Sequence, residues 1–191
     1  IGIFSNNLDE FFQVRYATVQ RIAQSDMTGR KIFGGKNAKD LLKAITKKVI
    51  HQQKETNKIL TNIENELEKE NIYFVNEQNV IAEHQEFLKE YFIQKVSPAL
   101  MTIIISEKFP QDLSDNHAFL AVKLSFEKTK NAENQYALIE IPTELDRFIV
   151  LPSIGKKQYV MFLDDLIRYH FHLIFNFFEF SSIEAHMIKV T

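Results

Sequence analysis

The sequence contains no cysteine and no tryptophan. The missing cysteine excludes disulfides and thiolate metal sites from this chain, and it fits a reducing compartment. No apolar run approaches the roughly 20 residues that a membrane-spanning helix needs, and no secretory segment is visible. The longest runs, such as Met101–Ile105, have the length of a buried strand. We therefore expect a cytoplasmic protein without a transmembrane segment; peripheral membrane association stays open.

Charge of either sign is not concentrated in a strong block, and the formal net charge is only -2. The sequence thus lacks the electrostatic footprint of a protein that binds duplex nucleic acid, and we expect no nucleic-acid partner. Hydrophobic residues make up 45% of the chain and include 17 phenylalanines. This composition predicts a globular chain with aromatic packing, in one large domain or two small ones.

Both ends of the sequence resemble interior segments of a longer protein. The chain begins with Ile1 instead of methionine, and an apolar run leads directly into a predicted helix. Residues 185–191 are typical of a strand and are followed by no turn or polar tail. We therefore expect an internal piece of a larger protein.

The first part of the chain has helical periodicity. Leu8, Phe11 and later apolar residues recur at helical spacing and predict a helix from about Leu8 to Gln24. Asn7 as N-cap and Glu10 three residues later form a capping-box pattern. A basic, glycine-containing loop, Thr28–Lys36, precedes a second helix of roughly 30 residues from Ala38 to about Lys69.

The second part of the chain changes from helical to β-rich patterns. A short extended link, Ile72–Val75, precedes a helix that ends at Ser97-Pro98, since proline restricts the residue before it. Beyond it one helix is expected at 162–175, and strands are expected at 119–126, 136–141, 148–151, 159–162 and 185–190, with Pro142 and Pro152 closing strands.

These patterns predict an α+β fold of two domains. Residues 1–100 would form a helical bundle with a long helical hairpin, and residues 101–191 a small α/β domain with a mainly antiparallel sheet.

The search for catalytic or metal-binding residues finds no complete constellation. Residues 29–36 depart from a phosphate loop, because Asn37 stands where serine or threonine would bind magnesium. His170 and His172 would point about 200° apart on a helix and suit no shared metal. Asp164 and Asp165 fit the start of a helix, where negative charge is favourable. We assign no catalytic residue and no metal ligand.

Asn6 and Asn7 are candidates for holding a nucleotide. An asparagine amide offers a donor and an acceptor side by side, which match an adenine edge, and a helix N-terminus favours anions. On composition alone, a plain helix cap is the favoured interpretation of Asn7.

A segment near the start of bacterial polyphosphate kinases of the first family closely resembles the first fifteen residues, Ile1-Gly2-Ile3-Phe4-Ser5-Asn6-Asn7-Leu8-Asp9-Glu10-Phe11-Phe12-Gln13-Val14-Arg15. The resemblance continues in the same order through segments 136–142, 147–152, 163–168 and 187–191. In that family a helical domain and a head domain precede two phospholipase-D-like catalytic domains. The chain resembles the first two of these, without the opening few dozen residues.

The resemblance implies a role in reversible transfer of the ATP terminal phosphate to polyphosphate, through a phosphohistidine. The family's catalytic histidines and magnesium ligands belong to domains outside this sequence, so the chain alone is expected to be inactive. Asn7 matches the family's ATP-contacting asparagine, which favours a nucleotide (ATP or ADP) contact in addition to a cap. The head domain implies a homodimer or higher homo-oligomer. The alternative is a non-catalytic interaction module without a ligand.

Overall fold

The structure is a computed structural model that describes residues 2–25, 37–105, 113, 117–126 and 134–189. Contacts divide the chain into two compact units, Ile1–Glu66 and Leu67–Thr191. Each unit is described by itself below.

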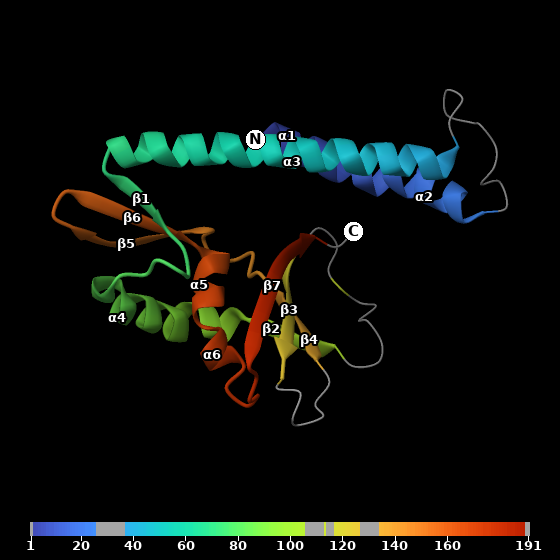
Figure 1. Ribbon diagram of the computed structural model, residues 1–191. Helices are drawn as coiled ribbons and strands as arrows, with labels where there is room; N and C mark the ends of the chain where they lie inside the picture. The colour runs from blue at the N-terminus through green and yellow to red at the C-terminus, as the bar shows by residue number, and fades with distance from the viewer. Residues whose placement is uncertain (1, 26–36, 106–112, 114–116, 127–133, 190–191) are drawn as a thin grey trace. The chain divides into compact units, whose positions relative to one another are not determined.

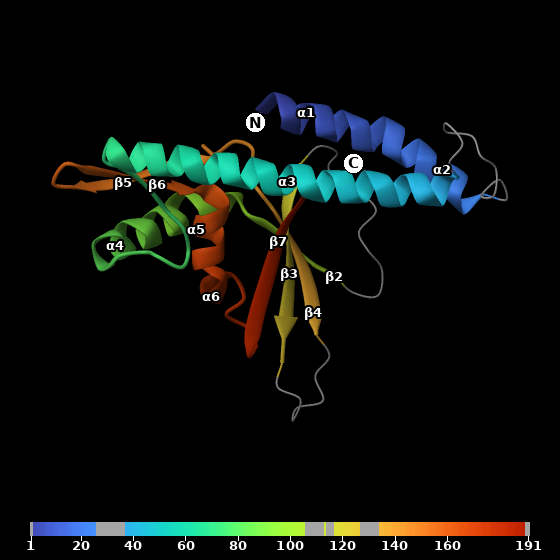
Figure 2. The ribbon, with the colours of Figure 1, turned by 45° about the horizontal axis from the view of Figure 1, so that its top comes forward.

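The first unit is a helical hairpin. Helix α1 (Gly2–Glu10) continues through a π-helical segment, η1 (Phe11–Tyr16), into α2 (Ala17–Gln24). The second arm is the 32-residue helix α3 (Ala38–Lys69), whose predicted bounds are confirmed. Figures 1 and 2 show the first arm lying alongside the N-terminal half of α3.

The predicted N-cap at Asn7 is wrong. Helix α1 begins at Gly2, so Asn7 lies inside it and its neighbouring amides belong to the helix. The reason is that Phe4, Leu8 and Phe11 follow one another at spacings of four and three, which extends the apolar stripe one turn further back than predicted. An asparagine cap does exist in this unit, at Asn37, where the side-chain oxygen accepts a hydrogen bond from the Asp40 amide at 2.8 Å.

The second unit contains two sheets. A three-stranded sheet has the order β1-β6-β5, with β1 (Ile72–Val75) parallel to β6 (Lys157–Phe162) and β5 (Phe148–Ile154) antiparallel to it. A four-stranded antiparallel sheet has the order β2-β4-β3-β7, built from β2 (Met101–Ile105), β3 (Ala118–Ser125), β4 (Gln135–Glu140) and β7 (Ser182–Lys189).

Helices fill the space beside these sheets. The first is α4 (Ala82–Tyr91), which runs on through η2 (Phe92–Val96) and η3 (Ser97–Ala99). The others are α5 (Leu163–Tyr169) and α6 (Phe171–Ile174), which Figure 1 shows directly after β6. One apolar core joins both sheets to the helices, with Leu120, Val122 and Leu124 pointing into it from alternate positions of β3.

The predicted mixed α+β class, with an antiparallel sheet, is confirmed. The strands lie within a few residues of their predicted positions. Two details differ. Pro152 does not close a strand, because β5 passes through it at an irregularity between Leu151 and Ile154. The helix predicted for 162–175 is interrupted at His170, which separates α5 from α6.

The packing of the chain changes before residue 100. Strand β1 and helix α4 belong to the second unit by their contacts, although they come before the first strand of the antiparallel sheet. The two contact units therefore do not have the same boundary as the predicted domains 1–100 and 101–191, and the division into those domains stays a prediction.

Candidate functional site

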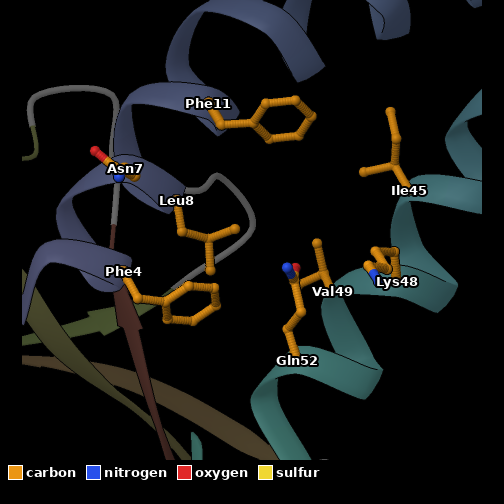
Figure 3. Close-up of a pocket in the computed structure, with 8 residues that line it drawn as sticks. All are labelled: Phe4, Asn7, Leu8, Phe11, Ile45, Lys48, Val49 and Gln52. Atoms are coloured by element: carbon orange, nitrogen blue, oxygen red, sulfur yellow. The ribbon is translucent and has the colours of Figure 1, made fainter. Parts of the chain in front are cut away.

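A groove of about 360 Å³ lies within the helical unit, between the first arm of the hairpin and α3. Figure 3 shows the side chains that line it, with Phe4, Leu8 and Phe11 pointing from the first arm toward α3. All three are partly buried. The complete lining consists of Phe4, Asn7, Leu8, Phe11, Ile45, Lys48, Val49 and Gln52.

Asn7 lies at the rim of this groove. Its side chain is exposed, and Figure 3 shows the amide turned away from the neighbouring apolar side chains. Because Asn7 is inside α1, its side chain is not used as the N-cap of a helix. The structure thus leaves the amide at a surface position where its oxygen and its NH₂ group face solvent.

Helix α3 contributes polar groups to the opposite wall. Lys48 is exposed, Gln52 is partly buried, and both line the groove beside Ile45 and Val49. Two phenylalanine rings offer an apolar floor, Gln52 offers a side-chain amide, and Lys48 offers a positive charge, while the Asn7 amide lies at the rim and faces solvent. This combination suits a flat, partly polar ring that carries an anionic group.

The sequence alone identified Asn7 but not the other members of the groove. Phe4, Phe11 and Val49 belong to apolar stripes at helical spacing, but such a stripe usually indicates helix packing and does not by itself predict a ligand site. Gln52 is a polar residue within the apolar stripe of α3, a signal that does not by itself mark a site, and Lys48 carries no local signal. Only the pairing of the two arms brings them opposite Asn7.

The carboxylate pair Asp164 and Asp165 lies in the first turn of α5, as predicted, although α5 has no side-chain cap bond at its N-cap, Phe162. The Arg147 guanidinium donates a hydrogen bond to Asp164 at 2.9 Å. Burial raises the pKa of Asp165 to about 7, and the nearby carboxylates of Asp164 and Glu77 add to this shift. The two carboxylates thus differ: Asp164 forms an ion pair with Arg147, and Asp165 has a raised pKa.

The histidines of the second unit make local contacts. His84 is fully buried, with Nε2 2.9 Å from the Pro152 carbonyl oxygen, and its Nδ1 has no hydrogen-bond partner among the described residues. His170 is also buried and stacks on Phe92 at 4.3 Å. His117 pairs with Glu140. Among the described residues, no group of three or more His, Asp or Glu side chains is arranged to hold a metal ion.

Two further points of the sequence analysis concern the basic loop and the transmembrane segment. The basic loop Arg30–Lys36 lies outside the described residues. Within the residues that the structure covers, no helix combines the length and apolar character needed to cross a membrane.

Comparison with known proteins gives two family matches. The polyphosphate kinase N-terminal domain matches residues 1–75, and the polyphosphate kinase middle domain matches residues 83–191. Polyphosphate kinases from Vibrio parahaemolyticus and Escherichia coli K12 are 32% and 30% identical over the whole chain, which covers 27% and 28% of their respective lengths.

The fold is also that of a solved structure. The polyphosphate kinase from Porphyromonas gingivalis superposes with a TM-score of 0.76 and 29% identity, over 96% of this chain and 27% of that one. The chain thus spans about a quarter of the length of the relatives it matches. Because two adjoining family domains together account for nearly all of its residues, the chain belongs to the polyphosphate kinase family.

Proposed function

We propose that this chain is a nucleotide-binding and dimerising part of a polyphosphate kinase. The parent enzyme would reversibly transfer the terminal phosphate of ATP to polyphosphate, through a phosphohistidine formed in another part of the protein. The names of the relatives support the activity, and the fraction of their length that this chain covers leaves room for a separate catalytic part.

The observation that carries the nucleotide-binding role is the position of Asn7 at the rim of the groove. An adenine ring is flat and apolar on its faces, which suits contact with Phe4 and Phe11. Its edge presents a donor and an acceptor side by side, which the Asn7 amide complements. Lys48 lies on the opposite wall, where its ammonium group would attract phosphate.

The rest of the reaction belongs to the parent protein in this proposal. The catalytic histidine, the magnesium ligands and most phosphate contacts would come from its other domains, so this chain alone would bind ATP weakly and transfer no phosphate. Residues 101–191 would provide the subunit contact of a homodimer or higher homo-oligomer. The parent enzyme would act in the cytoplasm.

Titration of the chain with ATP tests the nucleotide site. Asn7→Ala should weaken ATP binding about 5- to 10-fold, the effect of losing one or two hydrogen bonds. Alanine is a better helix former than asparagine, so the variant should keep α1 intact. The matched control is Asn6→Ala, since Asn6 is also exposed but, unlike Asn7, is not part of the groove lining, although the sequence had made both asparagines candidates. Equal ATP affinity in wild type and Asn7→Ala would count against the site.

A second test concerns the parent activity. The parent enzyme, supplied with ATP and Mg²⁺, should synthesise polyphosphate, and Asn7→Ala should raise its KM for ATP. A folded parent protein that makes no polyphosphate would reject the proposed activity. Analytical ultracentrifugation of the chain tests dimerisation separately.

A further inference from the structure

Helix α3 carries five lysines along one face. Lys39, Lys43, Lys47, Lys54 and Lys58 are all exposed. At about 100° per residue, they fall within an arc of about 100° around the helix axis. These five residues are called the lysine stripe below.

The lysine stripe is long and straight. It covers about 28 Å from Lys39 to Lys58, at about 1.5 Å per residue. It lies on the other side of α3 from Ile45 and Val49, which line the groove. The stripe is therefore a surface separate from the candidate nucleotide site.

Few carboxylates neutralise the stripe. Among the described residues, Lys58 has an ion-pair partner, Glu55 at 2.7 Å, and no ion pair joins a carboxylate to the other four lysines. The charge of α3 is also uneven along its length. The segment 38–58 has six lysines against Asp40 and Glu55, whereas the segment 59–69 has three glutamates against one lysine. The positive charge is concentrated in the first two-thirds of the helix.

Two shallow hollows follow the stripe. One is lined by Lys43 and Lys47 together with Thr46 and Ile50. The second lies further along α3 and is lined by Lys54, Asn57, Lys58, Thr61 and Asn62. Each hollow therefore places two ammonium groups at its edge, and the second adds amide donors. A chain of phosphates lying along α3 would meet cations at both hollows.

The lysine stripe fits a linear polyanion better than it fits nucleic acid. Lysine contributes compact positive charges that bind phosphate without a fixed geometry. Single-stranded nucleic acids are bound by combining such charges with aromatic side chains on which the bases stack. Helix α3 contains no phenylalanine, tyrosine or tryptophan. The surface offers positive charge and polar side chains but no aromatic ring for a base to stack on, and polyphosphate is a chain of anionic phosphates without bases.

We infer that the lysine stripe of α3 binds polyphosphate along its length. This inference rests on the proposed function, since it assigns one substrate of the parent enzyme to a specific surface. The stripe holds several consecutive phosphates at once, so affinity grows with the length of the polymer until the stripe is filled. Binding weakens with salt, because each phosphate contact releases counterions.

The test compares two triple variants of the whole chain. Lys43→Gln/Lys47→Gln/Lys54→Gln removes the centre of the stripe, and Lys89→Gln/Lys95→Gln/Lys156→Gln removes three exposed lysines from the second unit. The two variants have the same net charge. Glutamine retains helix propensity, so circular dichroism should show unchanged helix content for both.

Binding to a polyphosphate longer than the stripe should fall at least 10-fold in the stripe variant and less than 2-fold in the control. The slope of log affinity against log salt should become shallower by about 2, since three contacts are lost at roughly 0.7 to 0.9 each. Tripolyphosphate should bind much more weakly than the long polymer, and it should lose less affinity than the polymer in the stripe variant, because it contacts fewer lysines at once.

Three results would overturn the inference. They are equal losses in both triple variants, affinity that is independent of polymer length, or tighter stripe-dependent binding of oligothymidylate than of polyphosphate. ATP titration separates this inference from the proposed function. If ATP binding depends on Asn7 but polyphosphate binding does not depend on the lysine stripe, only the inference about the stripe is rejected. If polyphosphate binding depends on the stripe but ATP binding does not depend on Asn7, the proposed nucleotide site is rejected and the stripe remains a polyanion-binding surface.

Discussion

The side-chain oxygen of Asn37 accepts a hydrogen bond from the backbone amide of Asp40 at 2.8 Å, and the Asn37 carbonyl accepts one from Leu41 at 3.1 Å. These bonds make Asn37 the N-cap of α3. We expect Asn37→Ala to lower the free energy of unfolding of the helical unit by about 1 kcal/mol, because one amide of the first turn loses its acceptor. Urea unfolding followed by circular dichroism measures the change.

Asn7→Ala is the matched control for this prediction. Asn7 lies inside α1 instead of capping it, so the same substitution should leave stability unchanged or raise it by a few tenths of a kcal/mol. A larger destabilisation at Asn7 than at Asn37 would show that the N-cap has been assigned to the wrong asparagine.

The two asparagines show what the sequence can predict about helix ends. Each is followed three residues later by an acid, Glu10 or Asp40, so the local capping pattern is similar. The difference lies upstream. Phe4 continues the apolar stripe past Asn7, whereas glycines and a lysine precede Asn37. The end of a helix thus depends on how far the apolar face extends, and the long stripe of α3 made that helix predictable throughout.

Strand positions were predictable and strand pairing was not. Each strand follows a local run of β-formers, and β3 shows the alternation of a strand with one buried face. In contrast, Tyr73 in β1 pairs with Tyr159 in β6, far away in the sequence. No local pattern encodes this parallel pairing. The groove was unpredictable for the same reason, since its walls come from two separate helices.

Asp165 should make the second unit less stable as the pH rises. Burial raises its pKa in the folded state to about 7, above the unfolded value of about 3.9. The unfolded chain therefore releases this proton at lower pH than the folded chain, and stability falls between about pH 4 and pH 7. Asp165→Asn should increase stability at pH 8 by about 1 to 2 kcal/mol, a value reduced for partial solvent exposure.

Urea unfolding at pH 5 and pH 8 measures this effect. Asp146→Asn is the control, because it removes an exposed acid of the same unit and should leave the difference in stability between pH 5 and pH 8 as in wild type. The gain from Asp165→Asn should shrink at pH 5. A variant that is less stable than wild type at both pH values would contradict the prediction.

His170 should have the opposite dependence on pH. It is buried against Phe92, and burial lowers its pKa while its Nδ1 lies 3.0 Å from the Leu166 carbonyl oxygen. Below about pH 6.5 the unfolded chain binds a proton that the folded chain takes up less readily, so stability falls as the pH decreases. His170→Phe keeps a stacked ring and should reduce the stability loss between pH 6.5 and pH 5.

The control for His170 is the exposed residue His186, whose substitution by Phe should leave the pH dependence largely as in wild type. Chemical unfolding across this pH range provides the measurement. Parallel stability curves for wild type and His170→Phe would mean that His170 does not set the acid sensitivity of this unit.

Lys48 and Phe11 should contribute separately to nucleotide affinity, because they line the groove from different helices and offer different chemistry. Lys48→Gln should weaken ATP binding several-fold and leave adenosine binding unchanged, since only ATP has a charge for the ammonium group to attract. Phe11→Leu should weaken the binding of both ATP and adenosine, because a branched aliphatic group replaces the ring surface.

Lys95→Gln, in the second unit, is the control for the change in net charge. Calorimetric titration with ATP and adenosine distinguishes these outcomes: if Lys48→Gln reduced adenosine binding as much as ATP binding, the lysine would be supporting the shape of the groove and not the phosphates.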